Sequence, residues 1–542
     1  TITLAGGDPR PGQEGEWLAL HDWLSDTYPA AHAAMSREIV PGTLTLLYTW
    51  QGSDPSLKPI LLMAHQDVVP VNMGTESDWT GAPFAGEIID GYVYGRGAID
   101  DKGNLVGLME AAEALAISGF EPERTVLFMF GHDEEVSGSG AEAGVALLKS
   151  RGVEPEMALD EGFMIIDPSP LSGKPMGIIG IAEKGYVTVN VTAVAQGGHS
   201  STPPRNSANV NLAKAILALE ENQMPADFSR PPVSDLFRAA GKDMPFAQRM
   251  AMANLWLFQG MVESSLAKNS AGNAMVRTTT APTMLRGSAK ENVLPQRAIA
   301  TVNFRVHPND TPDEVIKHVR DVTAGIDGID VETGGDGINS PASPVSPTDN
   351  RAYAVLASVA ELAGNGAPVA PGLVLGATDS RFAAAITSNV YRFAPAIMTP
   401  ADLTGFHGTN ERISVENMGR LSKGYAQIIL GMDCSVPTRR SSLQVQLSTR
   451  PTRSSIRTPC SWNRRNRRSG MARSGSTSSA SLSVPNRASA SRQTSDVSPR
   501  ASPLAMRCTS MPPDTQIGVS PLRSSSAMVS LIRLGTCSDC AK

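Results

Sequence analysis

One short run of residues constrains the fold of this chain more than any other. Every side chain from Ile60 to Ala64 is apolar, and the polar residues His65 and Asp67 follow directly. An unbroken apolar run of this length predicts a strand that is buried on both faces, as in a parallel sheet. Ligands of open α/β sheets bind at the carboxyl ends of such strands. Because residues two apart in an extended chain point to the same side, His65 and Asp67 should lie together.

This pair of polar residues allows two interpretations. The spacing suits a metal-binding imidazole and a carboxylate that orients it. A histidine and an acid at a strand end can equally make only local hydrogen bonds, and taken alone this second interpretation is the more common one. The acidic residues that follow later in the chain favour the metal site.

Two later strands are also predicted to end in acids or histidine. The apolar run 125–130 leads into residues 132–135, which read His-Asp-Glu-Glu, and the run 157–159 leads into Asp160. Helical patterns separate the strands. Strand, helix and strand at this spacing predict an α/β fold with a doubly wound, mostly parallel sheet. The carboxyl ends of its strands would bring these side chains to one edge.

The pattern changes after the third of these strands. The runs 177–182 and 186–194 predict a hairpin, and residues 222–275 predict a mostly helical insertion. A strand at 298–306 and a helix opened by Thr311 complete an α+β unit. We therefore predict four parts: the first half of a catalytic domain at 1–184, a smaller inserted α+β lid domain at 185–338, the second half of the catalytic domain at 339–432, and a tail at 433–542.

Charge divides the chain into two unlike parts. From Asp433 onward, 17 Lys and Arg residues stand against 4 Asp residues, a net charge of +13. The preceding residues hold the other 30 basic and 49 acidic residues, a net charge of −19. All five cysteines lie in the basic part, so the acidic part can hold neither a disulfide nor a thiolate metal site.

The basic tail shows neither a helical nor an alternating period. Its mixture of Arg, Ser, Pro and Thr cannot bury enough apolar surface to offset the entropy of ordering. We therefore predict a disordered segment or the product of out-of-frame translation. Two functional alternatives are a nucleic-acid-binding arm and half of a zinc site at Cys537 and Cys540. We do not expect nucleic acid as a partner.

The start of the chain and its hydropathy leave the cellular compartment open. The sequence begins with Thr1, so we expect that the natural start is missing, together with any signal peptide. No stretch reaches the roughly 18 consecutive apolar residues of a transmembrane helix. We therefore expect no membrane span in this sequence, and the cytoplasm, the periplasm and the exterior all stay open as locations.

The strand ends and two later motifs supply a set of candidate metal ligands. Two histidines with several carboxylates suit two divalent ions, most often zinc. Two ions roughly 3.5–4 Å apart need a carboxylate that bridges them. In chain order the candidates are His65, Asp67, Asp100, Glu134, Glu135, Asp160 and His407.

At these motifs the chain resembles a family of dinuclear zinc peptidases and deacylases. The family includes the glutamate carboxypeptidases, succinyl-diaminopimelate desuccinylase, the aminoacylases and yeast carboxypeptidase S. The branch of carboxypeptidase S and the secreted N-acyl amino acid hydrolases resembles this chain at the segments LLMAHQDVVPV, GRGAIDDKG, NVLPQRA and NFRVHP. The resemblance extends from about residue 15 to residue 432.

The resemblance implies a metal role for five of the candidates. His65 and Asp160 would bind one zinc ion, and His407 and Glu135 would bind the other. Asp100 would bridge the two ions, often beside a cis peptide bond in this family. Two zinc ions per chain are thus expected, with cobalt or manganese as alternatives.

The resemblance also assigns three residues to catalysis. Glu134 would be the general base that takes a proton from the attacking water and returns it to the leaving nitrogen. Asp67 would orient His65 and support the catalytic glutamate. His199 would steady the carbonyl oxygen as it gains charge. In dimeric members this histidine comes from the partner subunit, which would require a homodimer through the lid; alternatively, His199 is an ordinary turn residue.

Three positions match the family's grip on the substrate's carboxylate, namely Asn292, Arg305 and the loop at Gly376. A planar guanidinium is well suited to binding a carboxylate. The alternatives are that Asn292 is a turn residue and that Arg305 is a solvated surface charge. We expect His132 and His307 to be structural.

The apolar side chains of the helical insertion also have two interpretations. They could line an apolar pocket for an acyl chain, although ordinary core is the more common role. The residues concerned are Met250, Met252, Leu255, Trp256, Leu257, Phe258 and Met261.

Together these features predict a zinc-dependent hydrolase. It would cleave the amide bond of a short peptide next to a free C-terminal carboxylate, as a carboxypeptidase or dipeptidase does. An N-acyl amino acid hydrolase, or aminoacylase, is the alternative, because the ligand motifs do not separate the two. A non-catalytic binding protein on the same fold is disfavoured by the intact Glu134 and the full ligand set.

Overall fold

An eight-stranded mixed sheet forms the centre of the computed structural model. The structure describes residues 13–334 and 339–433, so the predictions for the tail, including those for Cys537 and Cys540, lie outside the described residues. The strands follow one another across the sheet in the order β1 (Ser36–Ile39), β2 (Leu46–Trp50), β6 (Val126–Gly131), β3 (Ile60–His65), β7 (Met157–Ile166), β16 (Val390–Met398), β8 (Met176–Glu183) and β15 (Val369–Val374).

The middle of this sheet is parallel and its margins are mixed. Strands β6, β3, β7 and β16 run parallel to one another. Strands β1 and β2 form an antiparallel margin, while on the other side β8 is antiparallel to β16 and parallel to β15. The predicted α/β fold with a mostly parallel sheet is therefore confirmed.

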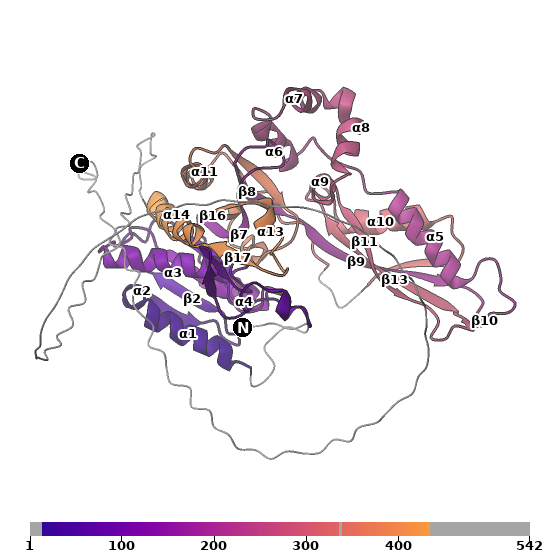
Figure 1. Cartoon of the computed structure of the whole chain (residues 1–542), viewed down its shortest axis with the longest axis horizontal. Coiled ribbons are helices and arrows are strands. Elements are labelled where there is room, and N and C mark those ends of the chain that lie inside the picture. The colour runs from indigo at the N-terminus through magenta and orange to yellow at the C-terminus, as the bar shows by residue number, and fades with distance from the viewer. Residues whose placement is uncertain (1–12, 335–338, 434–542) are drawn as a thin grey trace, which may run out of the picture. The chain divides into compact units, whose positions relative to one another are not determined.

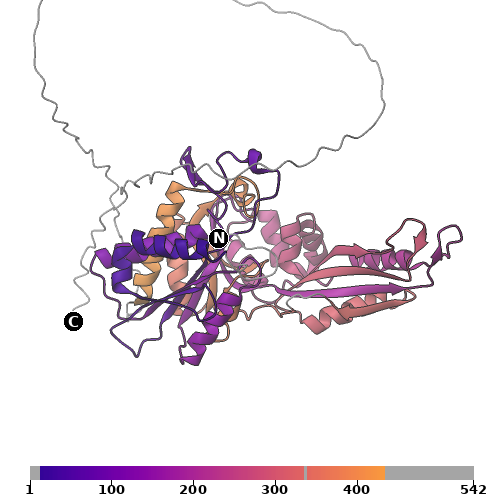
Figure 2. The ribbon, with the colours of Figure 1, turned by 90° about the horizontal axis from the view of Figure 1, so that it is seen from below.

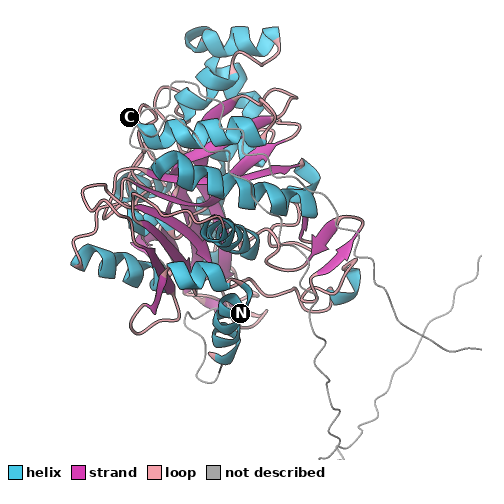
Figure 3. Ribbon diagram, turned by 90° about the vertical axis from the view of Figure 1, so that its left-hand side faces the viewer, coloured by secondary structure: helices cyan, strands magenta, loops and turns pink. Residues whose placement is uncertain are grey.

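Helices cover both faces of the central sheet, and Figure 3 shows them around the strands. Alternate residues of β3 face different cores, as its unbroken apolar run requires. Ile60 and Leu62 belong to the larger core cluster, while Leu61 and Met63 belong to a smaller one on the other face. The helices of this part are α1 (Gly15–Thr27), α2 (Pro29–Ala34), α3 (Lys102–Ile117), α4 (Ser139–Ser150), α11 (Arg351–Ala363), α12 (Ser380–Ala383), α13 (Pro400–Leu403) and α14 (Val415–Asp433).

A second sheet has four antiparallel strands in the order β11 (Thr279–Arg286), β13 (Arg297–Val306), β9 (Gly185–Val194) and β14 (Ile329–Thr333). Figure 2 shows its long strands lying side by side. Helices α5 (Ala208–Glu221) and α10 (Pro312–Thr323) contribute side chains to the core on this sheet. These elements occupy the segment predicted to be an inserted lid.

The hairpin predicted from the runs 177–182 and 186–194 is wrong. Strand β8 belongs to the central sheet and β9 to the second sheet, although only Lys184 separates them. All eight residues of β8 are buried. Because an apolar strand buried on both faces needs neighbours on both sides, β8 pairs with β15 and β16 instead of folding back on β9.

Four helices form the predicted helical insertion: α6 (Val233–Ala240), α7 (Phe246–Ala253), α8 (Leu255–Leu266) and α9 (Ser270–Val276). Figure 1 shows α6, α7 and α8 grouped together. Their inner side chains share a core cluster with residues of β8 and β15. The short strands are β4 (Glu87–Ile89), β5 (Tyr92–Tyr94) and β17 (Arg412–Ser414), which pair with one another, and β10 (Gly198–His199) with β12 (Val293–Leu294). Across residues 13–334 and 339–433, no helix has the length and apolarity needed to cross a bilayer.

Candidate metal centre

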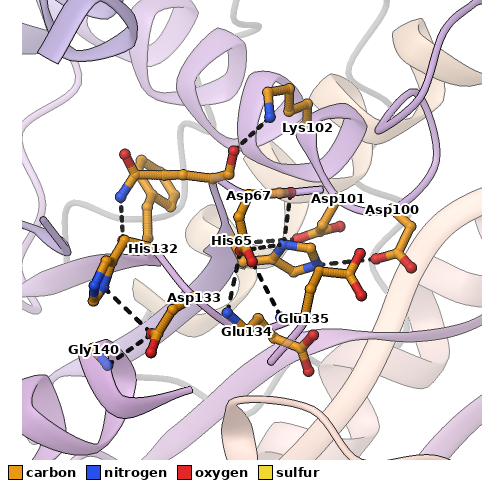
Figure 4. A network of polar contacts seen from close by, with 12 residues as sticks. His65, Asp67, Asp100, Asp101, Lys102, His132, Asp133, Glu134, Glu135 and Gly140 are labelled. Carbon is orange, nitrogen blue, oxygen red and sulfur yellow. Dashed lines mark hydrogen bonds and ion pairs between the residues drawn. The ribbon is translucent and has the colours of Figure 1, made fainter. Parts of the chain in front are cut away.

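His65 lies at the carboxyl end of β3 and is almost fully buried. Its Nε2 atom is 2.9 Å from Oδ1 of Asp100 and 3.4 Å from Oε1 of Glu161. Its Nδ1 atom is 3.2 Å from Oδ1 of Asp67. The ring is therefore oriented from one side by Asp67 and presents its other nitrogen to two carboxylates, as Figure 4 shows for Asp100.

His407 approaches the same carboxylate from the loop between α13 and β17. Its Nε2 atom is 3.0 Å from Oδ2 of Asp100 and 3.1 Å from Oε2 of Glu135. Its backbone has a φ of +53°, which is uncommon for a residue with a side chain. The two oxygens of Asp100 thus face different histidines, which is the arrangement that a bridging ligand requires.

Asp100 lies in the turn between β5 and α3, and the peptide bond that joins it to Asp101 is cis. Glu411 holds this turn in place, because its carboxylate accepts the backbone N–H groups of Ile99 and Asp100 at 2.8 and 3.1 Å. Arg96 forms an ion pair with the same carboxylate at 2.6 Å. Glu411 was not predicted from the sequence, and its position four residues after His407 was the only signal for it.

Glu134 and Glu135 follow the end of β6. Their backbone N–H groups each donate to one oxygen of Asp67, both at 3.2 Å. Asp67 therefore connects His65 to the loop that carries both glutamates, as Figure 4 shows. A ligand atom of Glu135 lies within 4.8 Å of His65 and Asp100, and one of Glu134 lies within 4.8 Å of His65 and Glu161.

The prediction that Asp160 lies beside His65 needs correction. Oδ2 of Asp160 instead accepts the backbone N–H of Ser380 at 2.8 Å, and Glu161 reaches the cluster. Successive residues of a strand point to opposite faces. The register of β7 against β16 is irregular after Asp160, and Gly162 has a φ of +134°. This irregularity makes it impossible to predict from alternation alone which of the two acids faces the site.

The charge balance of the cluster fits divalent cations. Oε1 of Glu135 is buried and has no hydrogen-bond partner among the described residues. Burial raises the pKa of Glu134 and of Glu161. Burial alone would also raise the pKa of Asp100, but hydrogen bonds from His407 and His65 outweigh it and lower that pKa. Several buried carboxylates with two histidines need compensating positive charge, which divalent ions supply.

Asp379 is a further acidic residue that was not predicted from the sequence. It is buried, and neither of its carboxylate oxygens has a hydrogen-bond partner among residues 13–334 and 339–433. Burial raises its pKa. A Cβ atom at Gly131 would lie 2.1 Å from Oδ2 of Asp379, and one at Gly138 would lie 2.3 Å from Oδ1. Both positions therefore require glycine. Because these contacts join segments distant in sequence, no local pattern could have indicated them.

The predicted residues of the second sheet are not at this cluster. His199 is exposed on β10, and its Nδ1 atom accepts hydrogen bonds from the hydroxyl and the backbone N–H of Ser201. Asn292 lies close to it, because its carbonyl accepts the N–H of Ser200. Arg305 lies near the other end of the sheet, with its guanidinium 4.8 Å from the ring centroid of Tyr186.

The remaining predicted positions are Gly376, His132 and His307. Gly376 is exposed between β15 and α12, with open space where a side chain would be. His132 and His307 are buried. Nδ1 of His132 bonds the hydroxyl of Thr45 at 3.0 Å, and Nδ1 of His307 accepts the N–H of Asn309. These contacts agree with structural roles for both histidines.

Comparison with known proteins identifies the family of this chain. The model of peptidase family M20/M25/M40 matches residues 61–431. The chain belongs to this family. It is therefore an enzyme of the hydrolase class, as predicted, and members of the family depend on metal ions.

Curated relatives and solved structures agree with this assignment. The N-fatty-acyl-amino acid synthase/hydrolase PM20D1 of Xenopus tropicalis is 38% identical over 76% of this chain and 80% of its own. The probable carboxypeptidase S-like 2 of Dictyostelium discoideum is 36% identical over 79% of this chain and 82% of its own. The M20 metallo-carboxypeptidase Sso-CP2 from Sulfolobus solfataricus shares the fold, with a TM-score of 0.54 and 18% identity over 76% of this chain and 93% of its own.

Proposed function

We propose that this member of the M20 family is a zinc-dependent amidohydrolase that holds two zinc ions per chain and cleaves an amide bond next to a free carboxylate. The observation that supports this proposal most directly is the position of Asp100 between two histidines, at 2.9 Å from one and 3.0 Å from the other. A carboxylate with each oxygen facing a different imidazole has the geometry of a ligand shared by two ions.

Each ion would take its ligands from separate parts of the chain. His65 and Glu161 would hold one ion and His407 and Glu135 the other, with Asp100 common to both. Nitrogen and carboxylate oxygen ligands of this kind favour zinc, with cobalt and manganese as alternatives. Asp67 supports the ring of His65, as a metal-binding imidazole generally requires.

Glu134 would supply the acid–base chemistry. When bound, divalent ions polarise the scissile carbonyl and make a water molecule more acidic. Glu134 is half-buried beside His65 and Glu161, so its carboxylate is within reach of the same small volume. It would accept a proton from the attacking water and return it to the leaving nitrogen. Asp67 fixes the backbone of Glu134 and thereby the direction of its side chain.

Arg305 and Asn292 would bind the substrate's carboxylate, with the backbone at Gly376 nearby, and His199 would stabilise the charge on the carbonyl oxygen. Arg305 stands eight residues along β13 from Arg297, which is roughly 26 Å of strand. His199 and Asn292 lie beyond the Arg297 end. One substrate can contact all of these groups only if His199 and Asn292 come from a second copy of the chain, so a homodimer through the lid is part of the proposal.

A mixing experiment tests the dimer. His199→Ala and Glu134→Gln are each expected to be inactive. Mixed and allowed to exchange subunits, the two variants should regain part of the activity, because one of the two sites in each mixed dimer then contains both intact residues. Two Glu134→Gln preparations mixed together serve as the control. A mixture that stays inactive while mixed dimers are present would overturn the assignment of His199.

Two substrate classes fit this site, and the names of the relatives divide between them. Carboxypeptidase S-like proteins point to short peptides, and the N-fatty-acyl-amino acid hydrolases point to acylated amino acids. A panel of dipeptides and N-acyl amino acids, assayed with zinc-loaded protein and again after chelation, should separate the two. Hydrolysis of neither class by the metal-loaded protein would overturn the proposed function.

Arg305 can be tested through the substrate's charge. Amidation of the substrate's carboxylate should lower kcat/KM by about ten- to a hundredfold, because one side of a charge-assisted hydrogen bond is lost. Arg305→Ala should show a similar loss on the acid and little change on the amide. Equal losses on both substrates would mean that Arg305 only stacks on Tyr186 and is structural.

A further inference from the structure

Helix α8 is apolar on two faces. Its inner stripe packs into the core shared with α6 and β8 and consists of Leu255, Phe258, Val262 and Leu266. Its outer face carries Trp256, Leu257 and Met261, which are 83%, 60% and 58% exposed. A helix that is apolar all round is normally buried in a protein or a membrane. The outer face of α8 is apolar, yet no other part of the described structure buries it.

Helix α7 extends this exposed surface. Phe246 and Met250 lie one helical turn apart and are 71% and 44% exposed, and α7 contacts α8. We call these five side chains the α7–α8 apolar patch: Phe246, Met250, Trp256, Leu257 and Met261. Single exposed apolar residues are ordinary, whereas a group of this size on two adjoining helices marks an interaction surface.

The structure thus divides the apolar residues of the helical insertion between two roles. Met252, Leu255 and Phe258 contact the core, which agrees with the more common interpretation of the sequence. The other four of that set belong to the exposed patch, so they do not line an internal acyl pocket. The proposed function gives these four exposed side chains no role.

The unpaired charges of the segment that carries the patch are of one sign. Between residues 241 and 270 the only acids are Asp243 and Glu263, and each is engaged by a cation outside this segment, Lys174 and Arg277 respectively. The cations of the segment are Lys242, Arg249 and Lys268, all three exposed and without an acidic partner among the described residues. An apolar surface bordered by unpaired cations is complementary to an anionic lipid surface.

We propose that the α7–α8 apolar patch docks on the surface of a phospholipid bilayer that contains anionic lipid. Trp256 and Phe246 would enter the boundary between head groups and acyl chains, where large aromatic side chains are favoured. Lys242, Arg249 and Lys268 would contact the head groups. This docking does not rest on the proposed function, because it concerns a surface separate from the metal centre.

A second copy of the chain is a poorer occupant of this patch. In a symmetric dimer each patch would face its own copy, so the three cations of one chain would approach those of the other with no free acid between them. Like charges brought together in this way oppose association. An anionic lipid surface attracts these cations instead of repelling them.

The test uses the full chain, so that the basic tail, with its net charge of +13, is the same in every variant. The patch variant carries Trp256→Ser, Leu257→Ser and Met261→Ser. The control carries Met73→Ser and Ile88→Ser, which remove side chains that are 96% and 68% exposed elsewhere on the chain. Cosedimentation is measured with vesicles of phosphatidylcholine and phosphatidylserine.

We expect the patch variant to bind these vesicles at least about tenfold more weakly than the unaltered chain, since burial of even one large apolar side chain is worth about that factor. The control should bind as the unaltered chain does. Equal binding by the patch variant and the unaltered chain would overturn the proposal. Loss of a dimer in sedimentation velocity, without any change in vesicle binding, would also overturn it and identify the patch as a contact between copies.

A second measurement covers the case in which the triple variant does not fold. Trp256→Phe keeps the apolar surface but removes the indole, so it should bind the vesicles nearly as well. Brominated phosphatidylcholine should quench part of the tryptophan fluorescence of the unaltered chain, and this part should be missing in Trp256→Phe. The same quenching in both proteins would show that Trp256 stays in water and would overturn the proposal.

Discussion

Oδ2 of Asp100 lies 3.0 Å from Nε2 of His407, although the two residues are 307 positions apart in the chain. The same carboxylate faces His65 with its other oxygen. The contacts of Asp100 therefore connect side chains from three separate segments of the chain.

Asp100→Asn should remove both metal ions, whereas His407→Ala should leave one of them. The amide offers only one good acceptor oxygen and no negative charge, so it cannot serve two ions at once. Loss of His407 removes a ligand from one ion only. Elemental analysis of the purified proteins gives the metal content, and the retention of two ions by Asp100→Asn would contradict the bridging role.

The neighbouring acids Asp160 and Glu161 should respond in opposite ways. Glu161→Ala should release the ion held by His65, because Glu161 is the acid that reaches that ring. Asp160→Asn should keep its metal and most of its activity, since the amide oxygen can still accept the N–H of Ser380. Metal content and kcat measured on both variants decide the matter. The reverse result would restore Asp160 as the ligand.

Glu134→Gln should lower kcat by about 10²–10⁴ while the metal content stays unchanged, because the amide cannot take up a proton from water. Glu135→Gln serves as the matched variant. It should lose metal, since the carboxylate of Glu135 faces His407 at 3.1 Å. If Glu135→Gln kept its metal and Glu134→Gln lost it, the base and the ligand would have to be exchanged.

Metal binding should release protons at neutral pH. Hydrogen bonds to Asp100 and Glu135 raise the pKa of His407 to about 10 in the metal-free protein. A metal ion binds only the neutral imidazole, so below that pH each ion that His407 accepts must displace a proton. Affinity should therefore rise by up to about tenfold per pH unit between pH 7 and pH 9. Titration calorimetry in buffers of different ionisation enthalpy counts the protons, and a count of zero at pH 7 would contradict this.

Much of the site could be predicted because its residues follow buried strands directly. The apolar run before His65 and the run before Glu134 each identify a strand end, and parallel strands bring such ends to one edge. Glu161 could not be chosen over Asp160 because the strand is irregular at that point. Glu411 and Asp379 could not be predicted either, since their roles depend on contacts between segments far apart in sequence.

In the fold, too, some features follow from neighbouring residues, and others depend on segments far away in the sequence. Helices α1 and α2 are separated at Tyr28, which directly precedes Pro29, and the helical conformation is disfavoured for a residue before proline. The path of β8 into the central sheet depends on β15 and β16, which come much later in the chain. A local pattern could therefore show that β8 is a strand but not which partners it has.

The position of β16 has a consequence for the growing polypeptide on the ribosome. This strand pairs with β7 and β8, yet it is synthesised only after every strand of the second sheet has been made. The second sheet uses strands that lie in one continuous segment, so it can fold while the central sheet still lacks two of its members. Until β15 and β16 emerge, parts of β7 and β8 expose unpaired edges, which favour aggregation. The loop with His407 emerges later still, so a newly made chain could complete the proposed metal centre only after every strand of the central sheet has been made.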